Sequence, residues 1–319
     1  MATRWPVFVL RKLGVLMITV LVSSLTIFLA LHLAPGDPAT AIAGGTKPNP
    51  ENLARIRAEF NLDDPWWSQY LSWLGGILSG DLGTSMVYKT DVSSLLSERL
   101  TSTTLLVFYS GALILLFGIG LGVIAGLGGR ATRTSISVAT TVAMGAPTFV
   151  VAIFLIALFA TTLDWLPIYG SGSGLVDRLR HLTLPAISLS LSYVAYVATV
   201  TRAAVDEEKV SEHVETAVSR GTPQRLITRR HVLRNAVAPI LTVSGLSIAG
   251  LFAGTAVAEQ AFGVNGIGSL LVDAAAKQDL AVVQVISLFM VVAFVVINTV
   301  IDAVNAFLDP RTALEGGQG

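Results

Sequence analysis

Six apolar segments of this chain are each long enough to cross a lipid bilayer, and they limit the fold more than any other feature. A hydrocarbon core about 30 Å thick takes about 20 helical residues. No water there can satisfy an open backbone, so each segment must be a helix. The composition agrees, because only 13% of residues are charged, against roughly 25% in soluble chains. We predict an all-α polytopic membrane protein with six transmembrane helices, at residues 13–33, 102–127, 136–163, 184–201, 237–258 and 281–308.

The Lys and Arg residues predict the orientation. With the N-terminus inside, most of the 21 basic residues fall in short cytoplasmic loops or at the cytoplasmic ends of spans, as the positive-inside rule requires. The first apolar run is longer than a signal-peptide core of roughly 7–15 residues, so we expect an uncleaved helix. The expected order is a cytoplasmic N-terminus at 1–12, helix 1 at 13–33, a substantial extracytoplasmic segment at 34–101, helices 2–6 within 102–308 with a cytoplasmic loop at 202–236, and a cytoplasmic tail at 309–319.

The cytoplasmic loop contains a dense charged stretch, ETAVSRGTPQRLITRRHVLRNAVAP, at residues 215–239. Gly221 permits a sharp turn or a close approach of a partner backbone. Thr222 and Pro223 are typical of a helix start, with Thr as the N-cap and Pro in the first turn. We expect Leu226 and Ile227 to be apolar anchors for a partner. The loop also contains four arginines, Arg225, Arg229, Arg230 and Arg234. They can pair with acidic groups of a partner or with anionic lipid, or they only mark the cytoplasmic side of the membrane.

No motif for catalysis or cofactor binding is present in the sequence. It lacks a Gly-x-x-x-x-Gly-Lys-Ser/Thr phosphate loop, a His-Glu-x-x-His pair and a Gly-x-Ser-x-Gly element, so this chain is not expected to bind ATP in that manner or to be an enzyme. There is no cysteine, and His213 and His231 are too widely spaced to indicate a metal site. The zero net charge gives no argument for nucleic acid as a partner.

Other residues stand out within the spans and in the segment between helices 1 and 2. Pro147 lies inside the third span and predicts a kink. Trp66, Trp67 and Trp73 belong to an aromatic amphipathic stretch typical of an interfacial helix. Five polar residues within spans are candidates for a translocation path, although such residues also serve helix packing: Ser188, Ser192, Tyr193, Tyr196 and Asn298.

Several stretches resemble, in order, the first permease subunit of the dipeptide, oligopeptide and nickel ABC importer family. The resemblance covers nearly the whole chain. It consists of LHLAPGDPA at 31–39, LSWLGGILSGDLGTS at 71–85, LPA at 184–186, the 215–239 loop, EQAFGVNGIGSLLVDA at 259–274 and DPR at 309–311. The chain departs from the family at Val264-Asn265-Gly266, where an aromatic-Pro-Gly is usual, and in the acidic segment 206–209.

The resemblance implies roles for particular residues. Glu215, Thr216, Ala217 and Gly221 match the loop that forms a coupling helix in a groove of the ATPase subunit in that family. Gly263, Gly266 and Gly268 lie next to an expected outer gate. The aromatic residues of the 34–101 segment are expected to meet an extracytoplasmic binding protein.

The resemblance also implies an assembly. The partners are a second, similar permease, two cytoplasmic ATPases that bind ATP and Mg²⁺, an extracytoplasmic substrate-binding protein and membrane lipid. The expected substrates are short peptides, with nickel or another small solute as the alternative. An autonomous secondary transporter or channel would call for ionisable residues near mid-membrane, which the spans lack, and a purely structural scaffold would not need the organised Arg-rich loop. The expected location is the bacterial inner membrane.

Overall fold

The computed structural model describes residues 5–33, 39–40, 49–59 and 61–308. Within these ranges the chain is helical, and its strand-like pairing is one isolated bridge between Thr84 and Asp91. Five of the described helices are long and apolar enough to cross a membrane, or six if one bent pair counts as a span. The predicted all-α membrane fold is therefore confirmed. Residues 34–38 of the LHLAPGDPA stretch, residues 1–4 and the tail at 309–319 lie outside the described residues.

The chain divides into two compact units, with the divisions falling inside α5 and α14 and between Val264 and Asn265. The first unit consists of Met1–Thr103 and Asn265–Ala293. It holds α1 (Trp5–His32), α3 (Pro50–Glu59), α4 (Trp66–Ser79), the start of α5 (Val92–Leu113), α13 (Ile267–Ala276) and the larger part of α14 (Leu280–Leu308).

The core of the first unit lies where α5, α13 and α14 meet. Val92, Ile267 and Ile286 are fully buried there. Asp279, also fully buried, precedes α14 and fixes the loop before α5, because its carboxylate accepts the Ser85 hydroxyl at 2.5 Å and the Val87 N–H at 3.3 Å. These donors satisfy a buried carboxylate that would otherwise be costly, so the loop is tied to the α13–α14 junction.

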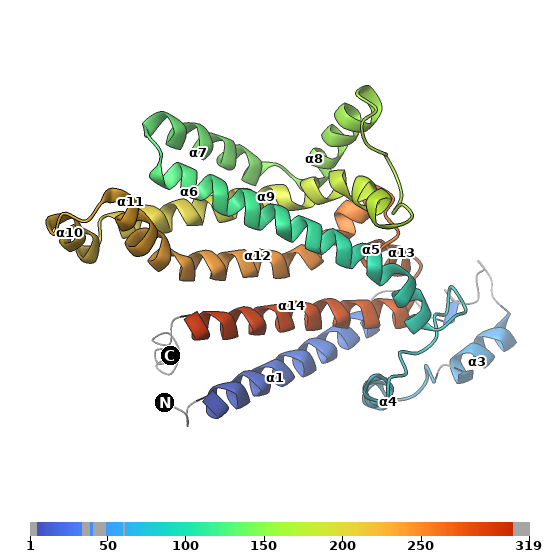
Figure 1. Cartoon of the computed structure of the whole chain (residues 1–319). Helices are drawn as coiled ribbons and strands as arrows, with labels where there is room; N and C mark the ends of the chain where they lie inside the picture. The colour runs from blue at the N-terminus through green and yellow to red at the C-terminus, as the bar shows by residue number, and fades with distance from the viewer. Residues whose placement is uncertain (1–4, 34–38, 41–48, 60, 309–319) are drawn as a thin grey trace. The chain divides into compact units, whose positions relative to one another are not determined.

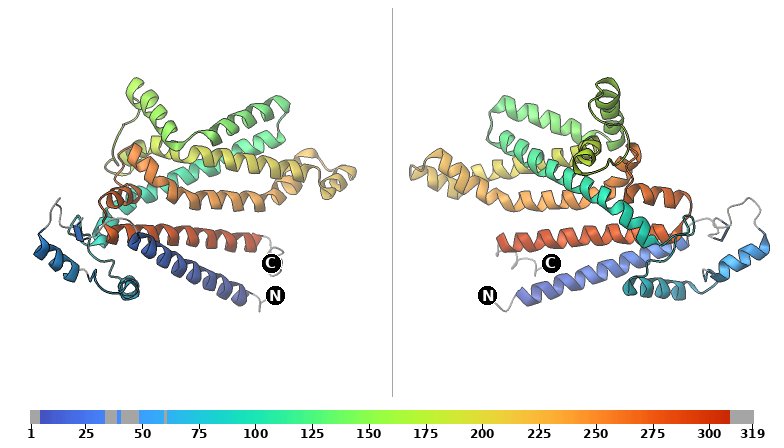
Figure 2. Two further views of the ribbon diagram at one scale, coloured as in Figure 1. Left: turned by 180° about the vertical axis from the view of Figure 1, so that it is seen from behind. Right: turned by 45° about the vertical axis from the view of Figure 1, so that its right-hand side comes forward.

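The second unit consists of Thr104–Val264 and Phe294–Gly319. Its centre is α9 (Leu175–Lys209), which packs against helices on several sides; Figures 1 and 2 show α6 and α12 alongside it. Leu182, Leu184 and Val197 of α9 are buried in its core. The surrounding elements are η1 (Ile114–Ile119), α6 (Gly120–Leu127), α7 (Arg130–Gly145), α8 (Thr148–Leu155), η2 (Ile156–Thr162) and α12 (Leu233–Ala261), where η marks a π-helical turn.

Three glycines let the η1–α6 segment approach α9 closely. Gly118, Gly122 and Gly126 recur every four residues and therefore share one helix face. A Cβ on Gly118 would lie 2.9 Å from the Val197 Cβ, one on Gly126 would lie 2.7 Å from the Val205 Cγ1, and one on Gly122 would overlap Thr201. We call these three glycines the glycine seam. Small residues at such spacing permit close backbone packing between membrane helices.

Several helices are longer than the predicted spans. The continuous helix Val92–Leu127 has 36 residues, or about 54 Å at 1.5 Å per residue, and therefore exceeds a hydrocarbon core of about 30 Å. α9 begins before and ends after the predicted 184–201 segment. Apolar composition marks the part of a helix inside lipid, whereas the backbone hydrogen bonds continue beyond it.

The predicted third span is sharply bent. α7 and the α8–η2 segment meet at an angle of 104°, and Ala146 and Pro147 between them are extended, with ψ of 117° and 137°. Pro147 has no N–H for a helical hydrogen bond, and it disfavours helical angles in the residue before it. The prediction of a kink at Pro147 is confirmed, and the bend is large enough to separate two helices.

We predict that Gly122→Ala destabilises the protein and that Gly120→Ala does not. The added methyl at 122 overlaps Thr201, whereas nothing lies within 4 Å of a Cβ at 120. Overpacking of this kind typically costs about 1–3 kcal/mol, while Ala is favoured over Gly in a helix by about 1 kcal/mol. Thermal unfolding of both purified variants in one detergent measures the difference. Equal midpoints for the two variants would contradict the close packing at the glycine seam.

Candidate functional site

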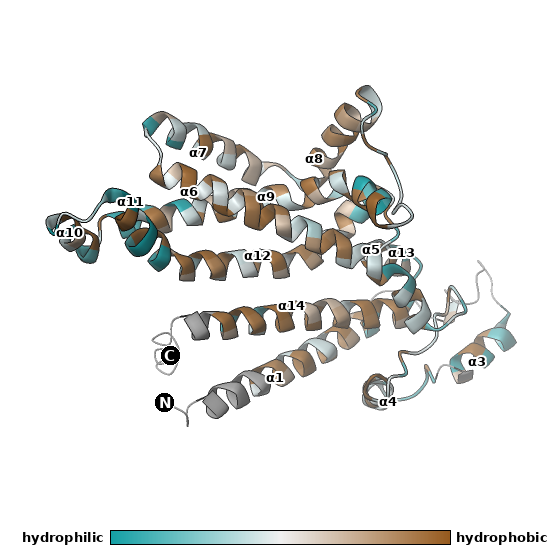
Figure 3. Cartoon of the chain, in the orientation of Figure 1, coloured by the Kyte–Doolittle hydropathy of each residue, from teal (hydrophilic) through white to brown (hydrophobic). Residues whose placement is uncertain are grey.

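The charged loop forms a small helical lobe between α9 and α12. It contains α10 (Glu212–Ser219), α11 (Gln224–Ile227) and η3 (Thr228–Val232). After the role that the family resemblance implies for this loop, we call residues 210–232 the coupling lobe. α11, η3 and α12 form one continuous helical run, Gln224–Ala261. Figure 3 shows strongly hydrophilic colour around α11 and brown along α12. The lobe is therefore a polar extension of two apolar helices.

The coupling lobe has its own apolar core. Val214 and Ala217 of α10 and Ile227 of α11 pack with buried residues from the ends of α9 and α12. The buried residues of α10 lie on one face and its exposed residues on the other, so the helix is amphipathic. Ile227 is 1% exposed, so the prediction that it is an anchor for a partner is wrong. Its role is to hold α11 against the membrane helices, while Leu226, 37% exposed, is available on the surface.

Gly221 closes α10 with a Schellman motif. The Thr222 N–H donates to the Ala217 carbonyl at 3.1 Å, and the Gly221 N–H donates to the Val218 carbonyl at 2.9 Å, which is the hydrogen-bond pattern of that motif. Gly221 has φ of +72°, a left-handed angle that residues with a Cβ adopt only at a cost. The conformation at residue 221 thus sets the direction in which the chain leaves α10.

The next helix begins later than the sequence predicts. The N-cap of α11 is Pro223, with no side-chain cap hydrogen bond, and its carbonyl accepts the Leu226 and Ile227 N–H groups at 2.8 and 3.1 Å. The prediction of Thr222 as N-cap is therefore wrong by one residue. Thr222 belongs to the turn that ends α10, because the Schellman motif already uses its N–H group.

The outer surface of the coupling lobe combines charge with a few apolar side chains. Val218 is 55% exposed and Leu226 is 37% exposed. Apolar contact residues within a polar, charged rim are typical of a protein interface. The exposed members of the predicted set are Glu215, Thr216, Gly221, Pro223, Arg225, Leu226, Arg229 and Arg230, while Ala217 is buried and Thr222 is half-buried.

His213 connects the elements at the base of the lobe. Its Nε2 lies 3.3 Å from Glu208 Oε2 on α9 and 2.9 Å from Asn235 Nδ2 on α12. Its ring centroid is 6.1 Å from that of His231. No group of three metal-ligating side chains occurs among the described residues. No pattern in the sequence pairs His213 with residues 208 and 235, because these lie on two different helices.

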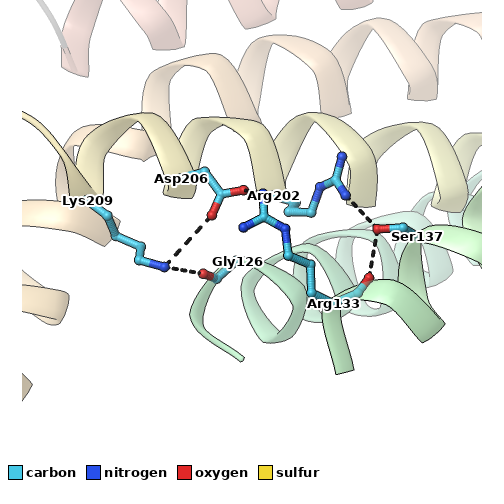
Figure 4. A network of polar contacts seen from close by, with 6 residues as sticks. All are labelled: Gly126, Arg133, Ser137, Arg202, Asp206 and Lys209. Carbon is cyan, nitrogen blue, oxygen red and sulfur yellow. Dashed lines mark hydrogen bonds and ion pairs between the residues drawn. The ribbon is translucent and has the colours of Figure 1, made fainter. Parts of the chain in front are cut away.

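A polar network joins α9 to the α6–α7 corner, as Figure 4 shows. The Lys209 ammonium donates to the Gly126 carbonyl at 2.8 Å, Asp206 pairs with Arg133, and the Arg202 guanidinium donates to the Ser137 hydroxyl. Gly126 has no side chain to cover its carbonyl, so the glycine seam ends at this contact. The acidic segment 206–209 that departs from the family pattern thereby supplies two of the network's side chains.

The predicted path residues are placed on two helices. Ser188 of α9 is buried and donates to the Pro185 carbonyl at 3.0 Å. Ser192 of α9 donates to the Ala143 carbonyl at 3.3 Å, next to the bend after α7. Tyr193 lies against Gly250 of α12, and Tyr196 is 40% exposed. Asn298 is on α14, where its amide donates to the Phe294 carbonyl at 3.1 Å. The hydrogen bonds of Ser188, Ser192 and Asn298 all go to backbone carbonyls, which is the packing role that remained open from the sequence.

The predicted outer residues are distributed over both units. Trp66, Trp67 and Trp73 belong to α4 of the first unit. Gly263 of the second unit has φ of +58°, and a Cβ there would lie 3.3 Å from the Tyr169 ring. Gly266 is the N-cap of α13 in the first unit, and Gly268 is buried within that helix. The Ile267 N–H donates to the Thr103 hydroxyl at 2.8 Å, which fixes the start of α13.

The chain matches two families along most of its length. Residues 118–314 match the binding-protein-dependent transport system inner membrane component, and residues 6–107 match the N-terminal component of such systems. A probable peptide ABC transporter permease protein of Sinorhizobium fredii is 34% identical over 96% of this chain and 98% of its own. A glutathione transport system permease protein of Shigella flexneri is 31% identical over 95% and 97%.

A solved structure shares the fold. It is titled as inward-facing conformations of the MetNI methionine ABC transporter, and it has a TM-score of 0.57 at 15% identity. The match covers 67% of this chain and 96% of that one. At this identity the likeness concerns the fold alone.

We predict that Arg133 and Asp206 stabilise the protein together. Arg133→Ala and Asp206→Ala should each lower the unfolding midpoint, and the double variant should lose less than the sum. The coupling should be about 0.2–1 kcal/mol because both side chains are partly exposed. The exchange Arg133→Asp with Asp206→Arg should recover part of the loss. A double-mutant cycle in detergent measures the coupling, and strictly additive losses would show that the ion pair contributes nothing.

Proposed function

The chain belongs to the family of binding-protein-dependent transport system inner membrane components, and on this premise we propose that it is a permease subunit of an ATP-driven importer of short peptides. The observation that supports this most directly is the coupling lobe, a compact polar structure built on the continuous ends of α9 and α12. A subunit without a phosphate-binding loop needs such a contact to receive work from a nucleotide-binding partner.

Short peptides are the substrate class that the relatives support. One relative's name specifies peptide transport and another's specifies glutathione, a tripeptide, and both align with nearly the whole of this chain. The α9 face with Ser188, Ser192 and Tyr196, together with Tyr193 and Asn298, would contribute to the translocation path. The hydroxyl groups would offer hydrogen bonds to a peptide backbone once the helices separate.

The coupling lobe would dock on an ATPase subunit. Its core ties α10 and α11 to α9 and α12, so a push on the lobe displaces those helices as a unit rather than bending the loop. Glu215, Arg225 and Arg229 would pair with charged groups of the ATPase, and Val218 and Leu226 would fill its apolar positions. ATP and Mg²⁺ would bind to the ATPase subunits, of which the complete importer has two.

The complete importer would also include a second, similar permease and an extracytoplasmic substrate-binding protein. Gly263, with its left-handed angle, and Gly266 and Gly268 at the start of α13 lie in segments of the expected outer side. Within its own unit, each segment would support the outer side that meets the binding protein. Exposed apolar residues elsewhere on the second unit, such as Val138, Val142 and Phe154, suit lipid or the second permease.

The proposed orientation places both termini and the coupling lobe in the cytoplasm and α3 outside. The absence of native cysteine allows a direct test with Ala54→Cys in α3 and Ser219→Cys in α10, both exposed positions. An impermeant thiol reagent added to intact cells should label residue 54 and not residue 219. Permeabilised cells should show labelling at both positions, which controls for reactivity. Labelling at 219 but not at 54 in intact cells would reverse the orientation.

The coupling role predicts that Gly221→Val impairs transport while Gly221→Asn is better tolerated. A β-branched residue is strained at φ of +72°, by about 1–3 kcal/mol, whereas Asn adopts left-handed angles more readily. A strain of about 1–3 kcal/mol corresponds to a factor of about 5 to 150 in the population of the native turn, so we expect peptide uptake by the reconstituted importer to fall by up to that factor for Val and by less for Asn. Glu215→Ala should act in the same direction but more mildly, because it removes a contact without strain.

The matched control is Gly129→Val at the α6–α7 corner. Gly129 has φ of −72°, and nothing lies within 4 Å of a Cβ there, so Val at 129 is not strained in the same way. The measurements are peptide uptake, ATP hydrolysis and co-purification of the ATPases, at matched abundance of the permease. Normal uptake with normally bound ATPases in Gly221→Val would reduce the coupling lobe to a connector.

A further inference from the structure

We infer that α4 is an in-plane membrane helix whose exposed apolar side binds the acyl chains of the lipid leaflet at the C-terminal end of α1. Under the proposed orientation this is the outer leaflet. The helix, WWSQYLSWLGGILS, contains no charged residue. The inference assigns Trp67 to lipid, in agreement with the interfacial helix predicted from the sequence, rather than to the binding protein that the family resemblance implies.

The first step is the depth at which α4 meets α1. The Tyr70 hydroxyl is 2.9 Å from the Ser24 hydroxyl, and the Phe28 ring packs against those of Tyr70 and Trp73 at centroid distances of 5.4 and 6.2 Å. Phe28 and Ser24 lie four and eight residues before His32, where the candidate span Gly14–His32 ends. At 1.5 Å per residue these contacts are about 6 and 12 Å from the end of the span. α4 therefore lies alongside the membrane helix rather than beyond it.

The second step is the arrangement of side chains around α4. Successive residues of a helix are about 100° apart, so three groups form separate stripes. Tyr70 and Trp73 form the side that contacts α1. Trp67, Leu71 and Leu78 fall within about 40° of one another and are 56%, 63% and 81% exposed. The three serines of the helix fall within a similar arc, about 100° around from the apolar stripe and facing away from α1: Ser68, Ser72 and Ser79.

The third step is the choice of occupant for the exposed apolar stripe. A helix with one side on a membrane span, one apolar side and one uncharged polar side fits the boundary between acyl chains and headgroups. Trp at the start of the helix suits the interfacial level. Exposing an apolar stripe of this size to water would be costly. A charged residue at the centre of the acyl region would cost about 2.5–3.5 kcal/mol, and α4 contains no charged residue that would prevent its burial in lipid. With one side packed on α1, lipid accounts for the other two sides, because acyl chains can contact the apolar stripe and headgroups the serine stripe.

The test uses the full-length chain within its assembled importer, reconstituted in phospholipid vesicles. Single cysteines replace Trp67, Leu71 or Leu78 and are labelled with a nitroxide, since the chain has no native cysteine. Collision rates are measured with oxygen, which concentrates in the acyl region, and with a water-soluble nickel chelate. Ile18→Cys in α1, 63% exposed within the candidate span, is the lipid control, and Ala54→Cys in α3 is the water control.

We expect the α4 labels to resemble residue 18, with oxygen collisions at least fivefold more favoured relative to the chelate than at residue 54. Ser72→Cys in the serine stripe should show more chelate contact than Leu71→Cys. Ratios like that of residue 54 at all three apolar positions would show that α4 faces water. Low collision rates with both reagents would show that protein covers the stripe, from the binding protein or the second permease. Either result overturns the inference and leaves the function of the coupling lobe untouched.

Discussion

The close approach of α6 to α9 is the contact on which the second unit depends. At Gly118, Gly122 and Gly126 the α9 side chains lie where a Cβ would otherwise be, so no larger residue fits without moving a helix. α9 in turn packs against α7, α8 and α12. A shift of α6 against α9 would therefore also disturb the surface of α9 on which α7, α8 and α12 pack. In lipid, where apolar side chains gain little from leaving the solvent, such fitted packing is a main source of helix association.

The polar network at the end of the glycine seam has a different role. Its ion pair between Arg133 and Asp206 is partly exposed and contributes about 0–1 kcal/mol, less than the cost of a single overpacked seam position. The ion pair also joins α7, not α6, to α9, so it is not what holds α6 to α9. The geometry of the network instead fixes which turn of α9 faces the α6–α7 corner, because Lys209 must reach the bare carbonyl of Gly126. The glycine seam therefore stabilises the packing of α6 on α9. The network sets the register of α9 against the α6–α7 corner, at the point where the coupling lobe begins.

The sequence predicts the long apolar helices and the position of the charged loop because these follow from local composition. It also predicts the effect of Pro147, whose missing N–H acts locally. The bend angle was not predictable, since it depends on how α7 and α8 pack against α9. Ile227 was misassigned because an apolar residue in a charged loop suits either a partner or a local core, and only the packing with Val214 and Val205 distinguishes them. The glycine seam did have a signal, the four-residue spacing, but the sequence does not name the helix that it faces.

The coupling lobe and α4 differ in chemistry for a physical reason. The coupling lobe must exchange contacts with a soluble partner, so its surface is charged and its shape is held by an internal core and the Schellman turn at Gly221. A charged surface on α4 would be incompatible with contacts at Phe28 and Ser24, inside the length of a span. Rigidity there comes from aromatic packing and one hydroxyl contact instead. The helical run Gln224–Ala261 joins the lobe to α12 without a loop, through the π-helical turn Thr228–Val232 and past Pro239, whose missing N–H removes one hydrogen bond of the run. Under the proposed function this run would carry a displacement of the lobe into α12.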